Sequence, residues 1–468
     1  MKKGIIYIMI ANIICLVFNL LTNFILPKYL SIETYALIKT YALYITYAGF
    51  FSLGYNDGMY LKYGGKGISE INKKDLSNNY LNYLILELIM SIFILIIGGS
   101  VKSTIIIAFS LGMFSTNVLG YLKSLYQATG EFSQYGNALN VEKITIFIFN
   151  IALIFVLKID NYIYYVWIQI IVGFFIMIYL TWRLEKQLNF IFIGKISLNQ
   201  FKENISSGFV LMLGNFSSGI FTGLDRWFIK ILMSSTNFAF YSFAVSTESV
   251  INVFMTPITV SMYNYFCKER EINKIKVIKC STLIWGFIVI SAAFPAKFIL
   301  EKFLSEYYPA NEIIFTLFAA QVFYVVIKGI YVNIYKVEKN QNKYFLQMIL
   351  MLLIGLILNI ILYMLFKSML SIAMGTLITS IVWLIICELG HKELRFNLKE
   401  YIAIAIILII YLFLGFYMNA ICGGIIYIIT VIIVSLIFMS NSTLYIYKLT
   451  LRFIINFISK IKKSINNY

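Results

Sequence analysis

The 468 residues are 60% hydrophobic and only 13% charged, and their mean hydropathy is +0.85. Because soluble globular proteins carry about 25% charged residues, this chain has too little polar surface for a water-soluble body of its size. The 38 basic residues exceed the 21 acidic ones, which gives a formal net charge of +17. In a soluble protein this excess would suggest a nucleic-acid partner, but here the basic residues fall in short loops. Membrane topology therefore explains them, and no nucleic-acid partner is expected.

Apolar stretches long enough to cross a bilayer recur along the whole chain. A hydrocarbon core about 30 Å thick needs roughly 20 apolar residues per helix. We therefore expect an all-α polytopic membrane protein with about fourteen transmembrane helices, at residues 5–26, 35–58, 80–99, 104–126, 138–157, 162–182, 206–229, 237–265, 280–299, 311–335, 344–366, 369–388, 401–418 and 421–440. The loops between them are short, and none is long enough for a soluble catalytic domain.

The distribution of Lys and Arg predicts the orientation, because basic residues concentrate in cytoplasmic loops. With the N-terminus in the cytoplasm, seven of the 38 basic residues fall outside, three lie inside the membrane and the remaining 28 are cytoplasmic. An even number of helices then places the C-terminus in the cytoplasm as well.

Two sets of matches indicate an internal repeat. At an offset of 203 residues, the polar residues of the first helix fall on those of the seventh: Asn12, Cys15, Asn19 and Asn23 on Asn215, Ser218, Thr222 and Arg226. At the same offset, Leu30–Ala36 falls on Met233–Ala239. At an offset of 209, Asn150–Lys158 falls on Asn359–Lys367, while Tyr126 and Tyr135 meet Tyr335 and Tyr344. Chance similarity among apolar residues is the alternative explanation.

A duplicated six-helix unit gives two bundles of the same orientation, as in some transporters. We expect an N-terminal bundle at 1–190, a second bundle at 191–392, and two additional helices with a basic cytoplasmic tail at 393–468. A central cavity is expected between the two six-helix bundles.

Polar side chains form stripes on four of the predicted helices, because residues seven or eleven apart share a helix face. The stripes are Asn12, Asn19 and Asn23 on the first helix; Lys39, Thr46 and Asp57 on the second; Asn204, Asn215, Ser218, Thr222 and Arg226, with Asp225 beside them, on the seventh; and Tyr241, Glu248, Asn252 and Thr259 on the eighth. A Lys or Arg at the bilayer centre costs at least about 2.5–3.5 kcal/mol, so these stripes should face protein or water.

The three basic residues within the membrane, Lys39, Arg226 and Lys328, are the candidate cations of a polar cavity. They would attract an anionic group such as a pyrophosphate, since a charge pair about 4 Å apart is worth roughly 4 kcal/mol at an effective dielectric near 20. The alternative is internal pairing, in which Asp225 neutralises Arg226 and Glu87 or Glu248 neutralises a Lys. Four carboxylates are candidates for carrying a coupling proton or sodium ion: Asp225, Glu248, Glu87 and Asp57.

The remaining motifs predict structure rather than chemistry. The five cysteines show no metal or disulfide spacing, and His391, the single histidine, lies in a predicted loop, so no catalytic residue, metal site or cofactor is expected. The pairs Gly54/Gly58 and Gly219/Gly223 indicate close helix packing or a bend.

The segment FILPKYLSIETYALIKTYALYITYAGFFSLGYNDGMYLKYGG resembles the opening signature of the polysaccharide and O-antigen flippases. Their second half typically starts with a helix ending in Asp-Arg, which is similar to GLDRWFIKIL with Asp225 and Arg226 here. YYPANEIIFTLFAAQVFY and the helix around Asn359 are similar too, so the resemblance covers most of residues 1–390.

This resemblance implies the multidrug/oligosaccharidyl-lipid/polysaccharide (MOP) exporter superfamily, whose members have two six-helix bundles around a central cavity. It implies a multi-pass protein of the bacterial cytoplasmic (inner) membrane that moves an undecaprenyl-diphosphate-linked oligosaccharide by alternating access. The partners it implies are the lipid-linked oligosaccharide, membrane lipids, H⁺ or Na⁺, and a polysaccharide polymerase with its chain-length regulator. Arg226, followed by Lys39 and Lys328, is the cavity cation that this resemblance favours.

Three competing functions stay open. A multidrug or cation antiporter of the same superfamily should have a net acidic cavity, whereas three cations are predicted here. A membrane-bound polymerase or ligase should have a large outside loop with functional Arg or His, and none is predicted. A flippase for a peptidoglycan or teichoic-acid precursor would differ in cargo and not in mechanism.

Overall fold

The computed structural model describes residues 2–191, 193–268, 271–338 and 340–447. Within these ranges, side chains are described except at residues 2–10, 214–222, 252–254, 256–261, 263–264, 268 and 341. The described chain is helical and contains no β-strand, which confirms the all-α prediction. It divides into two compact units, Met1–Ser242 and Phe243–Tyr468.

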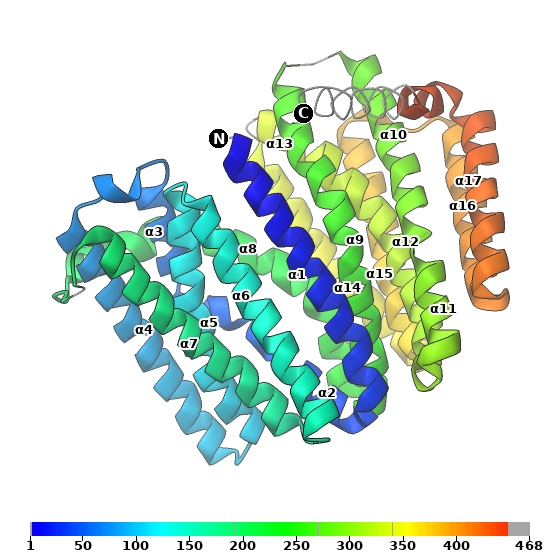
Figure 1. Cartoon of the computed structure of the whole chain (residues 1–468). Helices are drawn as coiled ribbons and strands as arrows, with labels where there is room; N and C mark the ends of the chain where they lie inside the picture. The colour runs from blue at the N-terminus through cyan, green and yellow to red at the C-terminus, as the bar shows by residue number, and fades with distance from the viewer. Residues whose placement is uncertain (1, 192, 269–270, 339, 448–468) are drawn as a thin grey trace, which may run out of the picture. The chain divides into compact units, whose positions relative to one another are not determined.

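The described residues of the first unit form eight α-helices and the beginning of a ninth (Figure 1). They are α1 (Lys2–Tyr29), α2 (Ile32–Thr46), α3 (Tyr55–Tyr63), α4 (Lys73–Ser100), α5 (Thr104–Ala128), α6 (Phe132–Ile151), α7 (Tyr162–Leu188), α8 (Leu198–Leu232) and the start of α9 (Ser235–Lys268). The 3₁₀ segments η1 (Ala48–Ser52) and η2 (Ile68–Glu70) flank α3, and the π-helical η3 (Ala152–Val156) extends α6.

The second unit contains the rest of α9 and the helices that follow it. They are α10 (Ile272–Ile290), α11 (Ala293–Phe303), α12 (Asn311–Val326), α13 (Val332–Val337), α14 (Gln341–Phe366), α15 (Met369–Gly390), α16 (Leu398–Tyr417) and α17 (Ala420–Phe438). A 3₁₀ segment η4 (Ser305–Ala310) precedes α12, the π-helical η5 (Ile327–Tyr331) joins α12 to α13, and η6 (Lys392–Leu394) precedes α16.

Eleven helical stretches of the described chain are long and apolar enough to cross a membrane, so the protein is a multi-pass membrane protein. The other three predicted spans, 35–58, 206–229 and 237–265, fall on α2, α8 and α9. The helix α2 has only 15 residues, and parts of α8 and α9 lie outside the described side chains. The total of fourteen therefore stays a prediction.

The predicted span 35–58 is not one helix. It ends as α2 at Thr46, passes through η1, and turns at Leu53 and Gly54, which have φ of 50° and 81°. The side chain of Asn117 stabilises the break, because its amide donates a 2.9 Å hydrogen bond to the Ala48 carbonyl. Since α3 starts a new axis after this turn, the prediction that Asp57 continues the face of Lys39 was wrong.

The structure supports the predicted repeat by placing the same local features at the same offsets. At an offset of 203, Ser31 and Ser234 begin α2 and α9 alike: the Oγ of each accepts from the backbone N–H three residues on, at 3.3 and 3.2 Å. At an offset of 209, Lys158 and Lys367 both adopt left-handed conformations, with φ of 52° and 47°, where α6–η3 and α14 end.

Burial follows the same repeat. At the 209-residue offset, Asn150 and Asn359 are 3% and 1% exposed, and Tyr126 and Tyr335 are 0% and 1% exposed. Helix packing recurs as well, since α4–α5, α5–α7 and α6–α7 in the first unit correspond to α10–α12, α12–α15 and α14–α15 in the second. Agreement of caps, burial and packing makes chance similarity a poor explanation.

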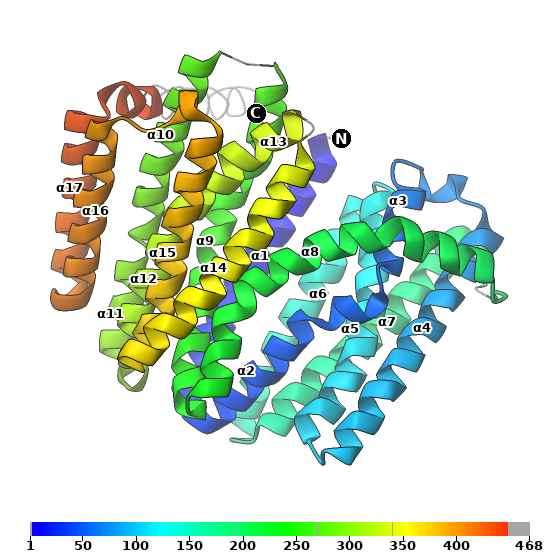
Figure 2. The same ribbon diagram turned by 180° about the vertical axis from the view of Figure 1, so that it is seen from behind.

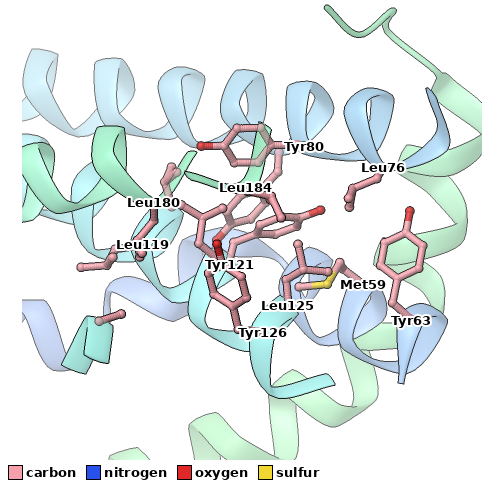
Figure 3. Close-up of a cluster of buried hydrophobic side chains, with 14 of the residues drawn as sticks. Met59, Tyr63, Leu76, Tyr80, Leu119, Tyr121, Leu125, Tyr126, Leu180 and Leu184 are labelled. Atoms are coloured by element: carbon pink, nitrogen blue, oxygen red, sulfur yellow. The ribbon is translucent and has the colours of Figure 1, made fainter. Parts of the chain in front are cut away.

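One end of the first unit has a core in which tyrosines are packed among leucines from α3, α4, α5 and α7 (Figure 3). The ring of Tyr121 stacks on Tyr83 at 4.8 Å, and its hydroxyl donates a 2.9 Å hydrogen bond to the Asn79 side chain. Tyr55 donates to the backbone carbonyl of the same Asn79 at 3.0 Å. These buried tyrosines link α3, α4 and α5 through both apolar contacts and hydrogen bonds.

The helix α8 packs closely against α3 in the first unit (Figure 2). A Cβ added to Gly58 would lie 2.0 Å from the Asn204 carbonyl oxygen, and one added to Gly208 would lie 2.0 Å from the Gly54 carbonyl oxygen. These contacts confirm that Gly54/Gly58 is a close-packing motif. For Gly219/Gly223 the first residue lies outside the described side chains, and a Cβ on Gly223 would meet the Tyr47 hydroxyl at 2.0 Å.

Candidate functional site

The predicted cations Lys39 and Arg226 come together in the first unit, where α1, α2 and α8 meet. The Lys39 ammonium donates a 3.0 Å hydrogen bond to the side-chain oxygen of Asn23 on α1. The guanidinium of Arg226 is near enough to act on Lys39 electrostatically. At 1.5 Å per residue, Lys39 lies about 10 Å along α2 from its first residue, Ile32. Arg226 lies about 9 Å along α8 from its last residue, Leu232.

A third cation, Lys230, joins this group, although it lies just beyond the predicted span 206–229. It lies four residues after Arg226 and therefore on the same face of α8. Its ammonium donates a 2.7 Å hydrogen bond to the buried Thr40 hydroxyl, next to Lys39, and lies 5.0 Å from the Phe238 ring. Only its spacing from Arg226 signalled this position in the sequence.

Asp225 is the acidic residue of this group, and it accepts a 2.9 Å hydrogen bond from the Tyr241 hydroxyl. We call the set the Lys39 cluster, and its members are Asn23, Lys39, Asp225, Arg226 and Lys230. Counted by formal charge, three basic side chains and one carboxylate leave an excess of two positive charges. Positive charge held this way in a membrane-spanning unit favours an anionic ligand.

Aromatic rings lie beside the Lys39 cluster. Trp227 stacks on Tyr44 with ring centroids 5.6 Å apart and planes at 18°, and Tyr47 tilts against the same indole at 6.0 Å. Arg226 also acts electrostatically on the Tyr47 hydroxyl. All three residues are half-buried.

The third predicted cation, Lys328, lies in the second unit with a different set of partners. The carboxylate of Glu248 on α9 acts on it electrostatically and accepts a hydrogen bond from the Gln321 amide. Every residue from Ile313 to Tyr335 is buried except Gln321, which is half-buried, and Lys328, which is exposed. Glu248 is therefore near enough to act on Lys328, and Gln321 and Lys328 are the two residues of this described stretch that are not buried.

The π-helical turn η5 explains how Lys328 is presented. Its widened backbone leaves carbonyls that the buried Asn333 side chain caps, with hydrogen bonds of 2.8 Å to Gly329 and 3.4 Å to Lys328. The Lys328 ammonium lies 5.7 Å from the Tyr324 ring. Turns of this kind occur often at functional sites.

Glu87 is completely buried on α4, with 0% exposure. The Asn117 amide donates to it at 2.8 Å and, with the same nitrogen, to the Ala48 carbonyl at the break after α2. Asp57 is half-buried on α3, beyond that break, and acts electrostatically on Tyr83. Neither carboxylate belongs to the Lys39 cluster.

The polar residues predicted to line a cavity divide into two groups. On α1, Asn12 and Asn19 are exposed and Asn23 is half-buried, and among these Asn23 contacts a predicted cation. The side chains of four others lie outside the described residues: Asn215, Ser218, Thr222 and Asn252.

Two further groups of charged residues within the helices were missed by the sequence analysis. On α5 and α6, Lys123 and Lys143 both pair with Glu142. In the second unit, Lys279 and Glu388 form an ion pair at 2.9 Å with side chains 0% and 1% exposed. Lys123 falls inside the predicted span 104–126, and Glu142 and Lys143 fall inside 138–157, which was the available signal.

Long apolar helices, a repeated bundle and charged side chains held inside it define a class, the multi-pass membrane proteins built from two related helical bundles. The chain belongs to the polysaccharide biosynthesis protein family, whose sequence pattern matches residues 1–269. No curated protein has a significantly similar sequence over this chain.

Solved structures of the MOP superfamily share the fold. The lipid II flippase MurJ, in an inward closed conformation, has a TM-score of 0.62 at 17% identity, with 93% of this chain and 98% of MurJ covered. An inward-facing multidrug resistance transporter of the MATE family has a TM-score of 0.61 at 12% identity, with 81% of this chain and 95% of the transporter covered. The fold is therefore that of the MOP superfamily, as the resemblance implied.

Proposed function

We propose that this protein is a flippase that carries an undecaprenyl-diphosphate-linked oligosaccharide, a repeat unit of a surface polysaccharide, across the bacterial cytoplasmic membrane. The observation that carries this proposal is the Lys39 cluster, with its excess of two positive charges. A diphosphate carries negative charge on two adjacent phosphates, and Lys39, Arg226 and Lys230 offer ammonium and guanidinium donors to both. Membership of the polysaccharide biosynthesis family supports this class of cargo.

The aromatic group beside these cations suits the other part of the cargo. Tyr44, Tyr47 and Trp227 are half-buried aromatic residues, and aromatic rings of this kind can pack against the apolar faces of sugar rings. A diphosphate held at Arg226 would place the first sugars within reach of these rings.

Transport by this fold would proceed by alternating access, with a central cavity between the bundles and both termini in the cytoplasm. Lys328 would be the cavity cation of the second unit, and the asparagine row of α1 would line the cavity. For ion coupling, Glu87 and Glu248 are the leading candidates, followed by Asp225 and Asp57. A polymerase with its chain-length regulator would take the product on the far side.

The alternative of a multidrug or cation antiporter is disfavoured by the same cluster. An organic cation at this place would meet three positive charges and one carboxylate, and it would be repelled. A flippase for a peptidoglycan or teichoic-acid precursor also carries a lipid-linked phosphate, and the identity of the accumulated cargo distinguishes it.

The test is deletion of the gene followed by measurement of the leaflet in which the lipid-linked oligosaccharide accumulates. We expect accumulation on the cytoplasmic leaflet, rescue by the wild type, and no rescue by Arg226→Ala. Arg395→Ala, which removes an exposed arginine from the loop before α16, should rescue fully. Normal surface polysaccharide in the deletion strain would rule out the proposed function.

A further inference from the structure

Three charged side chains, Lys123 on α5 and Glu142 and Lys143 on α6, form a group that the proposed function does not use. Both ammonium groups contact the Glu142 carboxylate, Lys143 at 3.2 Å. The side chains of Lys123 and Glu142 are 15% and 16% exposed, and that of Lys143 is 36% exposed. With one carboxylate between two lysines, the group keeps an excess of one positive charge within helices that cross the membrane.

The group lies toward the end of the first unit opposite the Lys39 cluster. Lys123 is five residues, or about 8 Å, from the end of α5 at Ala128. That end is held by a 3.0 Å hydrogen bond from the Gly65 N–H to the Ala128 carbonyl. The Lys39 cluster lies near the ends of α2 and α8 at Ile32 and Leu232, where Ser31 of the α1–α2 turn donates its N–H to Asp160 of the α6–α7 loop at 3.2 Å.

The polar row of α1 connects the two groups. At one end of the row, the Cys15 thiol contacts the Asn140 side chain at 3.4 Å and lies within the electrostatic reach of Lys123, Glu142 and Lys143. Eight residues further on, Asn23 contacts Lys39. Eight residues of α-helix span about 12 Å.

Between Cys15 and Asn23, the polar row of α1 continues with an exposed asparagine. Asn19 lies four residues from both Cys15 and Asn23, and it is exposed. Asn12, three residues before Cys15, is exposed as well. A hydrogen-bonding surface therefore runs along α1 from the lysine pair to the Lys39 cluster.

We propose that Lys123 and Lys143, with Asn140 beside them, form a second site for the phosphate groups of a polyprenyl diphosphate, occupied before the Lys39 cluster. This proposal rests on the proposed function, and with the N-terminus in the cytoplasm the second site lies on the cytoplasmic side of the Lys39 cluster. A phosphate competes with Glu142 for the two ammonium groups. The lower excess of positive charge makes this site the weaker one, so the diphosphate passes along Asn19 to the more positive cluster.

The test measures binding of farnesyl diphosphate, a short polyprenyl diphosphate, to the purified full-length protein in detergent by titration calorimetry. The wild type should bind two molecules per chain. Lys123→Gln combined with Lys143→Gln, and Lys39→Gln combined with Arg226→Gln, should each bind one. Lys73→Gln combined with Lys74→Gln, which neutralises two exposed lysines at the start of α4, should still bind two.

Glu142→Gln separates a binding role from a structural one. If Glu142 competes with phosphate, its neutralisation should tighten the weaker site at least threefold. If the group is only a structural ion pair, the same variant should lower the melting temperature and leave both affinities unchanged. Lys143→Gln alone, at the more exposed lysine, gives the same comparison should the double variant not fold.

The outcomes separate this proposal from the proposed function. Two sites remaining in the Lys123/Lys143 variant, or a single wild-type site that Arg226→Gln removes, would overturn the second site and leave the flippase assignment standing. Absence of any wild-type binding, together with rescue of the deletion strain by Arg226→Ala, would overturn both.

Discussion

The Lys39 ammonium and the Asn23 side-chain oxygen form a 3.0 Å hydrogen bond that joins α2 to α1. Arg226 repels the same ammonium from α8, so Asn23 is the neutral acceptor that keeps Lys39 in place without cancelling its charge. Under the proposed function, an amide at this position leaves the positive charge available to the diphosphate.

Asn23→Asp should therefore separate stability from transport. The new carboxylate would pair with Lys39, and a pair at about 4 Å is worth on the order of 4 kcal/mol at an effective dielectric near 20. We expect a melting temperature equal to or above that of the wild type and a flipping rate reduced at least tenfold in proteoliposomes. Asn23→Ser, which keeps a neutral acceptor, is the control, and unimpaired flipping by Asn23→Asp would contradict the role of the cluster.

Asn117→Ala should destabilise the first unit. Its amide serves both the buried Glu87 carboxylate and the Ala48 carbonyl, and a buried polar group left without its partner costs about 1–3 kcal/mol. The measurement is the thermal or chemical denaturation midpoint of the purified protein. Ser115→Ala, on the same helix, removes a hydroxyl that bonds only its own helix at 3.1 Å, and it should lower the midpoint less.

Glu87→Gln tests whether this carboxylate carries a coupling ion. Glutamine preserves the size of the side chain and an acceptor for Asn117, so the melting temperature should change little. If Glu87 binds a proton or sodium ion during transport, the dependence of flipping on the ion gradient should disappear. Retention of wild-type gradient dependence would remove Glu87 from the candidates.

Gly58→Ala should disrupt the crossing of α3 and α8, because the added Cβ would lie 2.0 Å from the backbone oxygen of Asn204. A backbone atom cannot move aside as a flexible side chain can, so the helices must separate at a cost of about 1–3 kcal/mol or more. Gly120→Ala is the matched control, since a Cβ there meets nothing within 4 Å. Equal melting temperatures for the two variants would contradict the close crossing.

Removing one member of the buried pair Lys279–Glu388 should be more damaging than removing both. Glu388 also accepts from the Phe396 N–H at 3.1 Å and from the Tyr401 hydroxyl, so it links α15 to α16 and to the loop before it. Leaving one buried charge unpaired costs roughly 3–5 kcal/mol. The measurement is the denaturation midpoint of Lys279→Met, of Glu388→Gln and of the double variant. We expect the double variant to be more stable than Lys279→Met. Losses of stability that add up in the double variant would contradict the coupling.

Sequence reasoning predicted the helices, the repeat and the meeting of Lys39 with Arg226 because each depends on a regular pattern. Apolar length predicts a helix, and spacing of seven or eleven residues predicts a shared face. The offset of 203 residues also placed Ser31 on Ser234 and Asn23 on Arg226, which the structure uses as helix caps and as cluster members.

The remaining features depend on contacts between distant segments. The break after Thr46 is stabilised by Asn117, about 70 residues later in the chain, and no local pattern announces it. Lys230 lies just beyond the predicted span 206–229, yet its partner Thr40 draws the side chain toward the helices. Lys123 lies inside the predicted span 104–126, but its partner Glu142 is on the next helix, so no local pattern joins the two. Charge near the end of an apolar stretch is ambiguous until its partner is known.

The crossing of α3 and α8 has a consequence for how the chain is assembled. By its repeat, α8 opens the second half, yet it is built into the first unit, and the segment leading to it is held on α4 by reciprocal hydrogen bonds of 2.9 and 3.1 Å between Asn82 and the Ser197 backbone. During synthesis the first unit therefore stays incomplete until the ribosome has passed the duplication boundary. An N-terminal fragment that ends before α8 would lack the helix that packs on α3. An N-terminal fragment that extends through α8 would retain the close contacts of Gly54, Gly58 and Gly208 between α3 and α8.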